Sequence, residues 1–266
     1  MQSDILSTQS LVRKFGELTA VDQVSFSVAE GQIFGLVGLN GAGKSTLIKM
    51  LITLLAPTAG TAQVCGFDLM RGAASIRRAI GYVPQLVSAD GDLTGYENLN
   101  LYAKLYDVPS DNRRYRIREA LAFMDLEAVG ERLVKTYSGG MVRRLEIAQS
   151  MLHRPQLLFL DEPTVGLDPV ARSSVWRHIM NLRKEFGTTI FLTTHLLEEV
   201  EELCTDMAIM TDGKMVACGT PAELKATVGP AATLEETFVH YSKVSREAAA
   251  GYAEAQLARR TARRLG

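Results

Sequence analysis

A glycine-rich segment constrains the fold of this chain more than any other feature of its sequence. It fits the pattern G-x-x-x-x-G-K-[ST] through four residues, Gly38, Gly43, Lys44 and Ser45. In such a loop, backbone N–H groups and the N-terminus of the following helix surround phosphate oxygens, while the lysine adds positive charge and the serine hydroxyl can bind magnesium. The pattern requires a strand before the loop and a helix after it.

The flanking sequence supplies both elements. Ile33–Val37 is short and apolar, which predicts a strand buried on both faces of a parallel sheet. Apolar residues then recur at helical spacing, which predicts a helix over Lys44–Leu55. Two more strands are predicted at Leu157–Leu160 and Thr189–Leu192, with a helix between them that ends near Gly187. Strand, helix and strand in succession predict an α/β fold with a mostly parallel sheet.

Other segments predict additions to this core. Val24–Val28 alternates apolar residues with serines, which predicts a half-buried strand at an antiparallel edge. Helical periodicity dominates from about 88 to 150, so we expect an inserted helical subdomain there. Asp212-Gly213 between two apolar runs predicts a β-hairpin. The alanine-rich residues 242–266 are expected to form a basic helical tail, with arginines at Arg259, Arg260, Arg263 and Arg264.

Composition excludes several classes of protein. The 29 basic and 30 acidic residues give a formal net charge of −1, so the overall charge does not indicate a nucleic acid partner. The three cysteines are far apart and odd in number, which favours reduced thiols in the cytosol. Met50–Phe67 lacks charged residues, but Pro57 and Gly60 interrupt it, so a short buried helix and a turn are predicted rather than a membrane span.

Acidic residues follow the second predicted strand. Asp161 and Glu162 come directly after Leu160, at the carboxyl end of the strand, which is where ligands bind in open α/β sheets. Asp161 is expected to orient magnesium, and Glu162 to accept a proton from an attacking water. His195 follows the next strand and is either a contact of the terminal phosphate or an ordinary polar residue.

A second glycine-containing segment precedes a predicted helix. Residues 137–141 read Tyr-Ser-Gly-Gly-Met, which suits either a second backbone site for phosphate or a helix cap. Arg143 and Arg144 follow on that helix. Neighbouring arginines on a surface helix are expected to be solvated or to face a partner rather than to act on phosphate.

Together these motifs resemble the nucleotide-binding subunit of ATP-binding cassette (ABC) transporters, from about Leu6 to Tyr241. The matching segments are the Walker A motif at Gly38–Thr46, the Q-loop at Gln85, the signature at Ser138–Met141, Walker B at Leu157–Glu162, the D-loop at Gly166–Asp168 and the switch histidine His195. The signature departs from the common Leu-Ser-Gly-Gly-Gln at Tyr137 and Met141. Its serine and both glycines are retained.

The resemblance implies a P-loop NTPase core with an antiparallel β-subdomain and an inserted helical subdomain, together forming one ATPase domain over residues 1–241. It implies ATP as the nucleotide, Mg²⁺ as the cofactor and ATP hydrolysis as the reaction. The residues expected at ATP are Phe15, Gly38, Asn40, Gly41, Gly43, Lys44, Ser45, Thr46, Gln85, Ser138, Gly139, Gly140 and Asp168. Those expected at magnesium are Ser45, Gln85 and Asp161, and those expected in catalysis are Lys44, Glu162 and His195.

The resemblance also implies partners. In the family, the signature of one subunit closes over ATP on the Walker A loop of another, so a homodimer or heterodimer is expected. An integral-membrane transporter subunit is the second expected partner, which places the chain peripherally at the cytoplasmic face of the cell membrane. Gly-Gly-Met in the signature, Thr194–Glu199 and Leu234–Phe238 are similar to the drug- and lipid-exporting branch.

Three alternative functions stay open at this point. They are an ABC importer subunit, a soluble ABC-type ATPase acting on nucleic acid or ribosomes, and a small-molecule kinase. The kinase explains neither Ser138-Gly139-Gly140 nor the long insertion before Asp161.

Overall fold

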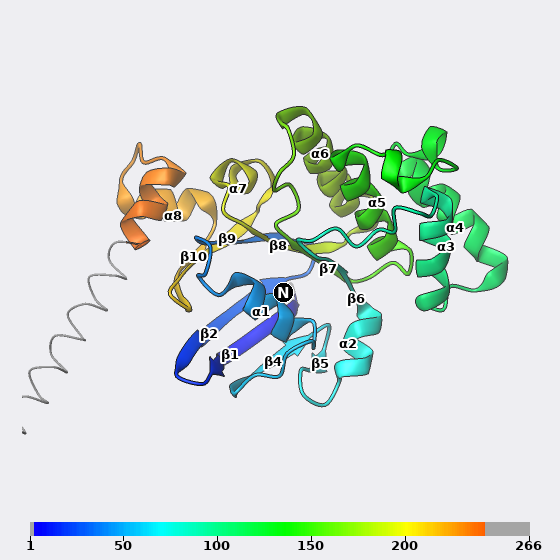
Figure 1. Ribbon diagram of the computed structural model, residues 1–266. Helices are drawn as coiled ribbons and strands as arrows, with labels where there is room; N and C mark the ends of the chain where they lie inside the picture. Colours follow the sequence, from blue (N-terminus) through cyan, green and yellow to red (C-terminus); the bar gives the residue numbers. More distant parts are fainter. Residues whose placement is uncertain (1–2, 243–266) are drawn as a thin grey trace, which may run out of the picture.

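Two β-sheets form the centre of the structure, a computed structural model that describes residues 3–242 (Figure 1). The strands are β1 (Asp4–Phe15), β2 (Leu18–Ala29), β3 (Ile33–Val37), β4 (Ala59–Val64), β5 (Phe67–Asp68), β6 (Ile80–Val83), β7 (Leu157–Asp161), β8 (Thr189–Thr194), β9 (Asp206–Thr211) and β10 (Lys214–Gly219). The larger sheet has the order β10-β9-β3-β8-β7-β6 and is parallel except between β9 and β10. The smaller sheet, β2-β1-β4-β5, is antiparallel. This arrangement confirms the predicted α/β P-loop fold.

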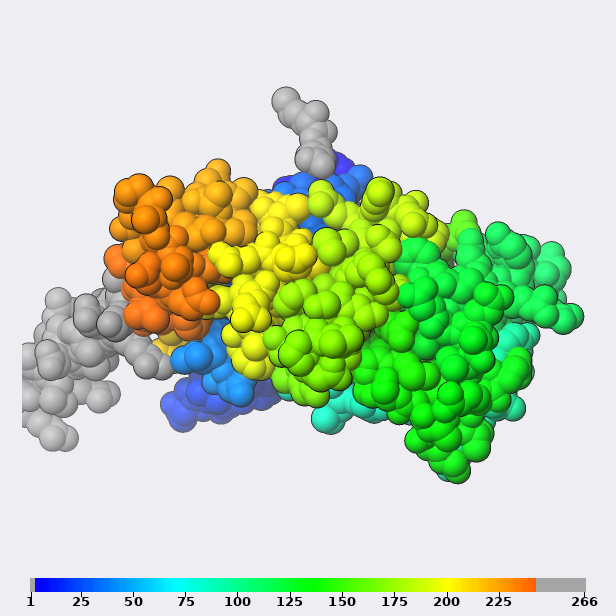
Figure 2. Space-filling view, turned by 90° about the horizontal axis from the view of Figure 1, so that it is seen from above, coloured from blue at the N-terminus to red at the C-terminus, as the bar shows by residue number. Residues whose placement is uncertain are grey.

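Helices surround the larger sheet and occupy the space between the two sheets. They are α1 (Lys44–Leu51), α2 (Ala73–Ala79), α3 (Gly95–Leu105), α4 (Ser110–Phe123), α5 (Gly139–Met151), α6 (Pro169–Phe186), α7 (Leu197–Leu203) and α8 (Pro221–Val228), with 3₁₀ turns η1 (Glu127–Val129) and η2 (Val134–Thr136). Residues 234–242 are also helical. Helices α3, α4 and α5 gather at one end of the molecule, opposite α8, and this green lobe is clear in Figure 2. The helices expected between about 88 and 150 therefore lie together.

Apolar clusters of the core lie on both sides of the larger sheet. Between the two sheets, α1 packs on an aromatic cluster in which the Phe191 ring lies 5.4 Å from Phe34, 5.4 Å from Phe159 and 6.0 Å from Phe26, measured between ring centroids. On the opposite side, α3 to α6 cover the sheet with a second apolar cluster. Because both faces of β3, β7 and β8 are covered, every residue of these strands is buried.

Local signals explain where several elements begin and end. Asp168 caps α6 by accepting from two backbone N–H groups, Pro169 is its first residue, and Gly187 ends it with a φ of 66°. Asp212 and Gly213 have φ angles of 49° and 80°, which suit the tight turn of the predicted β9–β10 hairpin.

The predicted helix over Lys44–Leu55 is wrong at its C-terminus. It ends at Leu51, and Thr53 adopts a left-handed φ of 66°, which turns the chain away from the helix axis. The rest of the uncharged stretch then forms β4 and reaches the start of β5, two strands that the sequence did not predict. Within residues 3–242, no helix combines the length and the apolar character needed to span a membrane. The predicted basic tail, apart from Ser242, lies outside the described residues.

Candidate functional site

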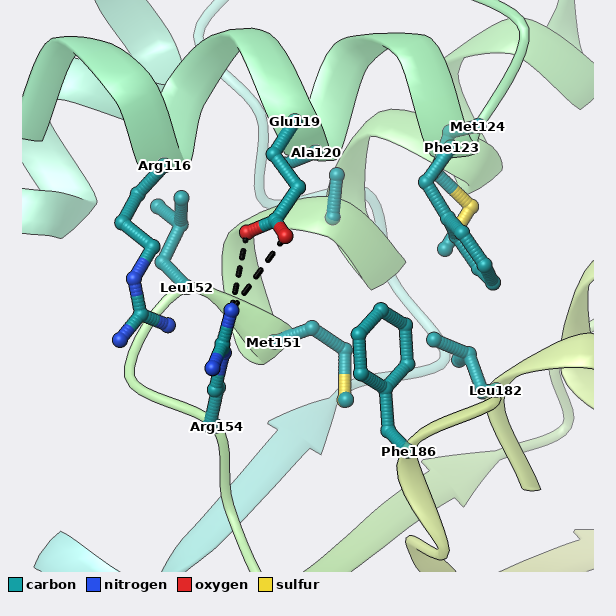
Figure 3. A pocket seen from close by; sticks show the side chains of 11 residues that line it. Arg116, Glu119, Ala120, Phe123, Met124, Met151, Leu152, Arg154, Leu182 and Phe186 are labelled. Atoms are coloured by element: carbon teal, nitrogen blue, oxygen red, sulfur yellow. Dashed lines mark hydrogen bonds and ion pairs between the residues drawn. The ribbon is translucent and has the colours of Figure 1, made fainter. Parts of the chain in front are cut away.

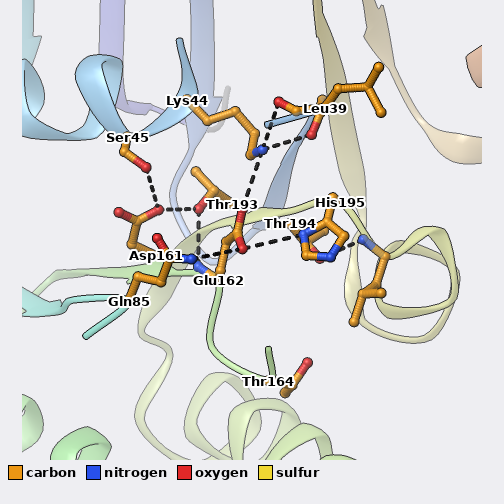
Figure 4. A network of polar contacts seen from close by, with 12 residues as sticks. Leu39, Lys44, Ser45, Gln85, Asp161, Glu162, Thr164, Thr193, Thr194 and His195 are labelled. Carbon is orange, nitrogen blue, oxygen red and sulfur yellow. Dashed lines mark hydrogen bonds and ion pairs between the residues drawn. The ribbon is translucent and has the colours of Figure 1, made fainter. Parts of the chain in front are cut away.

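The predicted catalytic residues meet at one edge of the larger sheet. Strands β3, β8 and β7 are parallel neighbours, so the residues that follow them emerge side by side. Lys44 and Ser45 come from the loop after β3, Asp161 and Glu162 from the end of β7, and His195 from the end of β8. Their side chains form one network of polar contacts (Figure 4).

Lys44 is held by the loop that precedes it. Its Nζ donates to the carbonyl oxygens of Gly38 at 2.7 Å and Leu39 at 3.3 Å, and lies 3.4 Å from Glu162 Oε1. The side chain is only 4% exposed. A buried ammonium group with these partners is a fixed positive charge at the mouth of the phosphate loop.

Asp161 and Ser45 form the part of the site that fits magnesium. Asp161 Oδ1 accepts hydrogen bonds from Ser45 Oγ at 3.2 Å and from Thr193 Oγ1 at 2.6 Å. A carboxylate beside a hydroxyl supplies the hard oxygen ligands that Mg²⁺ prefers. The donor set therefore suits magnesium.

Glu162 lies at the centre of the network. One carboxylate oxygen, Oε2, accepts from Gln85 Nε2 at 3.3 Å and lies 3.3 Å from His195 Nδ1, while the other faces Lys44. The residue is buried, and its backbone has a φ of 50°. This left-handed conformation costs free energy for residues other than glycine. Thr193 stabilises this backbone by accepting from Glu162 N through both its carbonyl and hydroxyl oxygens, each at 3.1 Å.

An open cleft of about 520 Å³ lies over the phosphate loop. Its lining residues are Phe15, Leu18, Ala20, Leu39, Asn40, Gly41, Ala42, Gly43, Lys44, Ser45, Thr46, Gln85 and Glu162. Within the described chain, the N-cap of α1 is Gly43, which has no side chain to cap the helix, so the first N–H groups of α1 suit phosphate oxygens. Gly43 has a φ of 105°, and a Cβ there would collide with the Ala20 carbonyl oxygen. Phe15, 45% exposed at the end of β1, presents a ring at the other side of the cleft.

The signature and D-loop residues lie elsewhere in this chain. Ser138 caps α5 by accepting from Met141 N at 3.3 Å, and Gly139 and Gly140 form the first turn of that helix. Asp168 caps α6 through the N–H groups of Val170 and Ala171, both at 3.0 Å. All four lie outside the set of residues that lines the cleft. Their contact with nucleotide stays a prediction that involves a second subunit.

Two polar residues of the site were missed or misjudged from sequence. Thr193, which joins Asp161 to the Glu162 backbone, is an unremarkable threonine near the end of a strand and carried no signal. Arg143 was expected to be solvated or partner-facing, and this is wrong. It is 6% exposed and donates to the carbonyl oxygens of Pro84 at 2.8 Å and Gln85 at 3.0 Å. The acidic Glu146 three residues later was the available signal.

A second cavity lies between α4, α5 and α6, away from this network (Figure 3). It has a volume of about 40 Å³ and is lined mainly by apolar side chains. The ion pair between Glu119 and Arg154, at 3.2 Å, lies at its margin. This volume is less than a tenth of that of the cleft over the phosphate loop, so the cavity is too small for a nucleotide.

Known proteins of one family match this chain. The family described as ABC transporter matches residues 21–165. The chain is 43% identical over 220 residues to the Nod factor export ATP-binding protein I of Ralstonia nicotianae, covering 83% of this chain and 68% of that protein. It is also 43% identical over 224 residues to the daunorubicin/doxorubicin resistance ATP-binding protein DrrA of Streptomyces peucetius, covering 84% and 68%.

A solved structure agrees with these relatives. It is described as the ATP binding subunit of an ABC transporter and is 32% identical to this chain, with a TM-score of 0.79 over 89% of this chain and 99% of that one. The sequence matches and the shared fold lead to one conclusion, which is that this chain belongs to the ABC transporter family as an ATP-binding subunit.

Proposed function

We propose that this chain binds ATP with Mg²⁺ and hydrolyses it to drive export through a separate membrane subunit. The observation that carries the proposal is the convergence of Lys44, Ser45 and Glu162 on one cleft above the phosphate loop. Asp161 joins this group through its hydrogen bond from Ser45. Phosphate recognition, a magnesium-type donor set and a buried carboxylate that can take a proton are thereby found together.

The loop and α1 would bind the phosphates of ATP. The unpaired N–H groups at the start of α1 and the Lys44 ammonium offset the phosphate charge. Phe15, which lines the cleft, would stack on the adenine ring. When bound, magnesium neutralises charge on the phosphate oxygens, and Ser45, Asp161 and Gln85 are the residues that would hold it.

Glu162 would accept a proton from the attacking water. The water oxygen forms a bond to the terminal phosphorus, the bond from that phosphorus to the bridging oxygen breaks, and ADP and phosphate are released. Gln85 and His195 flank the Glu162 carboxylate and fix its direction. We expect Ser138 and Gly140 to complete the site across the interface of a homodimer or heterodimer, where they would stabilise charge on the transferred group.

The relatives favour export over import. Their names describe a Nod factor export protein and a daunorubicin/doxorubicin resistance protein. We therefore propose a drug-like, lipid or other hydrophobic solute as the cargo and an integral-membrane protein as the partner, with this chain peripheral at the cytoplasmic face of the membrane. Copurification with a tagged chain from gently solubilised native membranes tests the partner, because recovery of only soluble proteins or nucleic acid would contradict it.

The variant Glu162→Gln tests the catalytic role. It keeps the size of the side chain and removes its basicity, so ATP binding should persist while turnover falls by about a hundredfold or more. Glu119→Gln, at the margin of the distant small cavity, is the matched control and should retain normal turnover. Near-normal hydrolysis by Glu162→Gln would remove this residue from the mechanism.

A further inference from the structure

Helix α5 carries a stripe of buried polar side chains at three-residue spacing. Arg143, Glu146 and Gln149 are 6%, 2% and 1% exposed, respectively. Three-residue spacing places them along one side of the helix. Buried polar side chains are usually hydrogen-bonded, and each of these three has polar partners on the surface that the stripe faces.

That surface is the segment that contains Gln85. Arg143 donates to the carbonyl oxygens of Pro84 and Gln85, and its Nη1 lies 3.1 Å from Glu146 Oε2. Glu146 Oε1 accepts from the backbone N–H of Ser88 and, at 3.0 Å, from its hydroxyl. The two side chains therefore bind this segment on both sides of its exposed tip, residues 86–87.

The third residue of the stripe, Gln149, is linked through Asn98 to the chain just after this segment. Gln149 Nε2 donates to Asn98 Oδ1 at 3.2 Å, and Asn98 exchanges hydrogen bonds with the backbone of Asp90, each at 2.9 Å. Between the two anchored parts, Leu86 and Val87 are 82% and 67% exposed. Apolar packing thus contributes little at the tip, and polar contacts to α5 determine its position.

We propose that Arg143 and Glu146 are positioning residues that hold Gln85 against the Glu162 carboxylate and make this loop move together with α5. The inference rests on the proposed function for the importance of Gln85 in hydrolysis. The mechanical link itself is a property of the contacts between α5 and residues 84–88. Because α5 begins with Ser138-Gly139-Gly140, a movement of that helix on closing over a second subunit's nucleotide would be transmitted to Gln85.

Amide hydrogen exchange tests the mechanical link in the full-length chain without reference to activity. In Arg143→Met, peptides covering 84–88 should exchange faster than in the wild type. Glu146→Gln keeps an acceptor for Ser88 but loses the ion pair, so it should show a smaller increase. Arg144→Met is the matched control, because Arg144 donates to the carbonyl oxygens of Met124 and Asp125 instead. Unchanged exchange of 84–88 in Arg143→Met would overturn the inference.

A double-mutant cycle tests the catalytic consequence. Arg143→Met should lower kcat by about tenfold to a hundredfold through misplacement of Gln85. In a Gln85→Ala background, the same substitution should have little further effect, because the group through which it acts is gone. Multiplicative losses in the double variant would refute positioning through Gln85 and indicate a general structural role. If the wild type itself fails to hydrolyse ATP, the proposed function is wrong. The hydrogen-exchange experiment still tests whether α5 holds residues 84–88.

Discussion

Thr193→Val gives the sharpest test of how the site is built. Thr193 is completely buried, and its hydroxyl joins the Asp161 carboxylate to the backbone of Glu162. Valine has nearly the same shape, so the substitution removes a hydroxyl without opening a cavity. Of its hydrogen bonds from Ser45 and Thr193, Asp161 Oδ1 would then keep only the one from Ser45.

The size of the effect follows from the bonds that are lost. A hydrogen bond to a charged group contributes about 1.5–3 kcal/mol. Glu162 N keeps the carbonyl oxygen of Thr193, also at 3.1 Å, so this donor is not left without a partner. We therefore expect the free energy of unfolding to fall by about 2 kcal/mol. Removal of a group that orients a magnesium ligand should also raise the Mg²⁺ concentration needed for half-maximal ATP hydrolysis by about 10–100-fold.

The assay compares Thr193→Val with Thr189→Val on the same strand. Thr189 is equally buried, but its hydroxyl accepts from the uncharged backbone N–H of Gly31 at 2.9 Å. Urea unfolding should show a loss of about 1 kcal/mol for Thr189→Val, and a Mg²⁺ titration of ATPase activity should match the wild type. If both variants reached half-maximal activity at the same Mg²⁺ concentration as the wild type, the role assigned to Thr193 at Asp161 would be wrong.

Two further predictions concern the core. Phe191→Ala removes the ring that contacts three other phenylalanines and should destabilise the protein by about 3–5 kcal/mol in urea unfolding, whereas a loss below about 1 kcal/mol would contradict the central place of this ring. Burial raises the pKa of Glu199 above its ordinary value of 4.5. Its ionisation therefore lowers the free energy of unfolding as the pH rises from that value to the folded-state pKa, and the loss stays constant above it. Melting temperatures of Glu199→Gln should therefore improve relative to the wild type with rising pH, and a constant difference would disprove the reasoning.

The elements that sequence predicts well are those with a local physical cause. The phosphate loop and the strand before it are defined by eight neighbouring positions and by continuous apolar character. The hairpin at Asp212-Gly213 and the C-terminus of α6 at Gly187 follow from residues that readily adopt positive φ. By contrast, β1 pairs with β2 through several register irregularities, so its apolar residues do not alternate cleanly and the strand gave no period-two signal.

The parts of the site that sequence missed depend on distant partners. Arg143 becomes a buried residue because carbonyl groups 58 and 59 residues away accept its hydrogen bonds. Within one helical turn of Arg143, only Glu146 indicates that this arginine is buried. A charged pair at that spacing is more often found on a solvated helix face. Motif matching located the phosphate loop and the acidic residues beside it, but it could not locate the side chains that support them.

The position of β3 in the larger sheet has a consequence for how the chain is made. Ile33 of β3 pairs with Ile190 of β8, so the strand before the phosphate loop gains this neighbour only after about 150 further residues have been synthesised. At ordinary rates of translation, about 5–20 residues per second, this takes about 8–30 s. During the first part of that interval, until β7 is made, the nascent chain contains the complete loop sequence but neither Asp161 nor His195. A fragment that stops before β7 would therefore carry the loop motif without Asp161, Glu162 or His195.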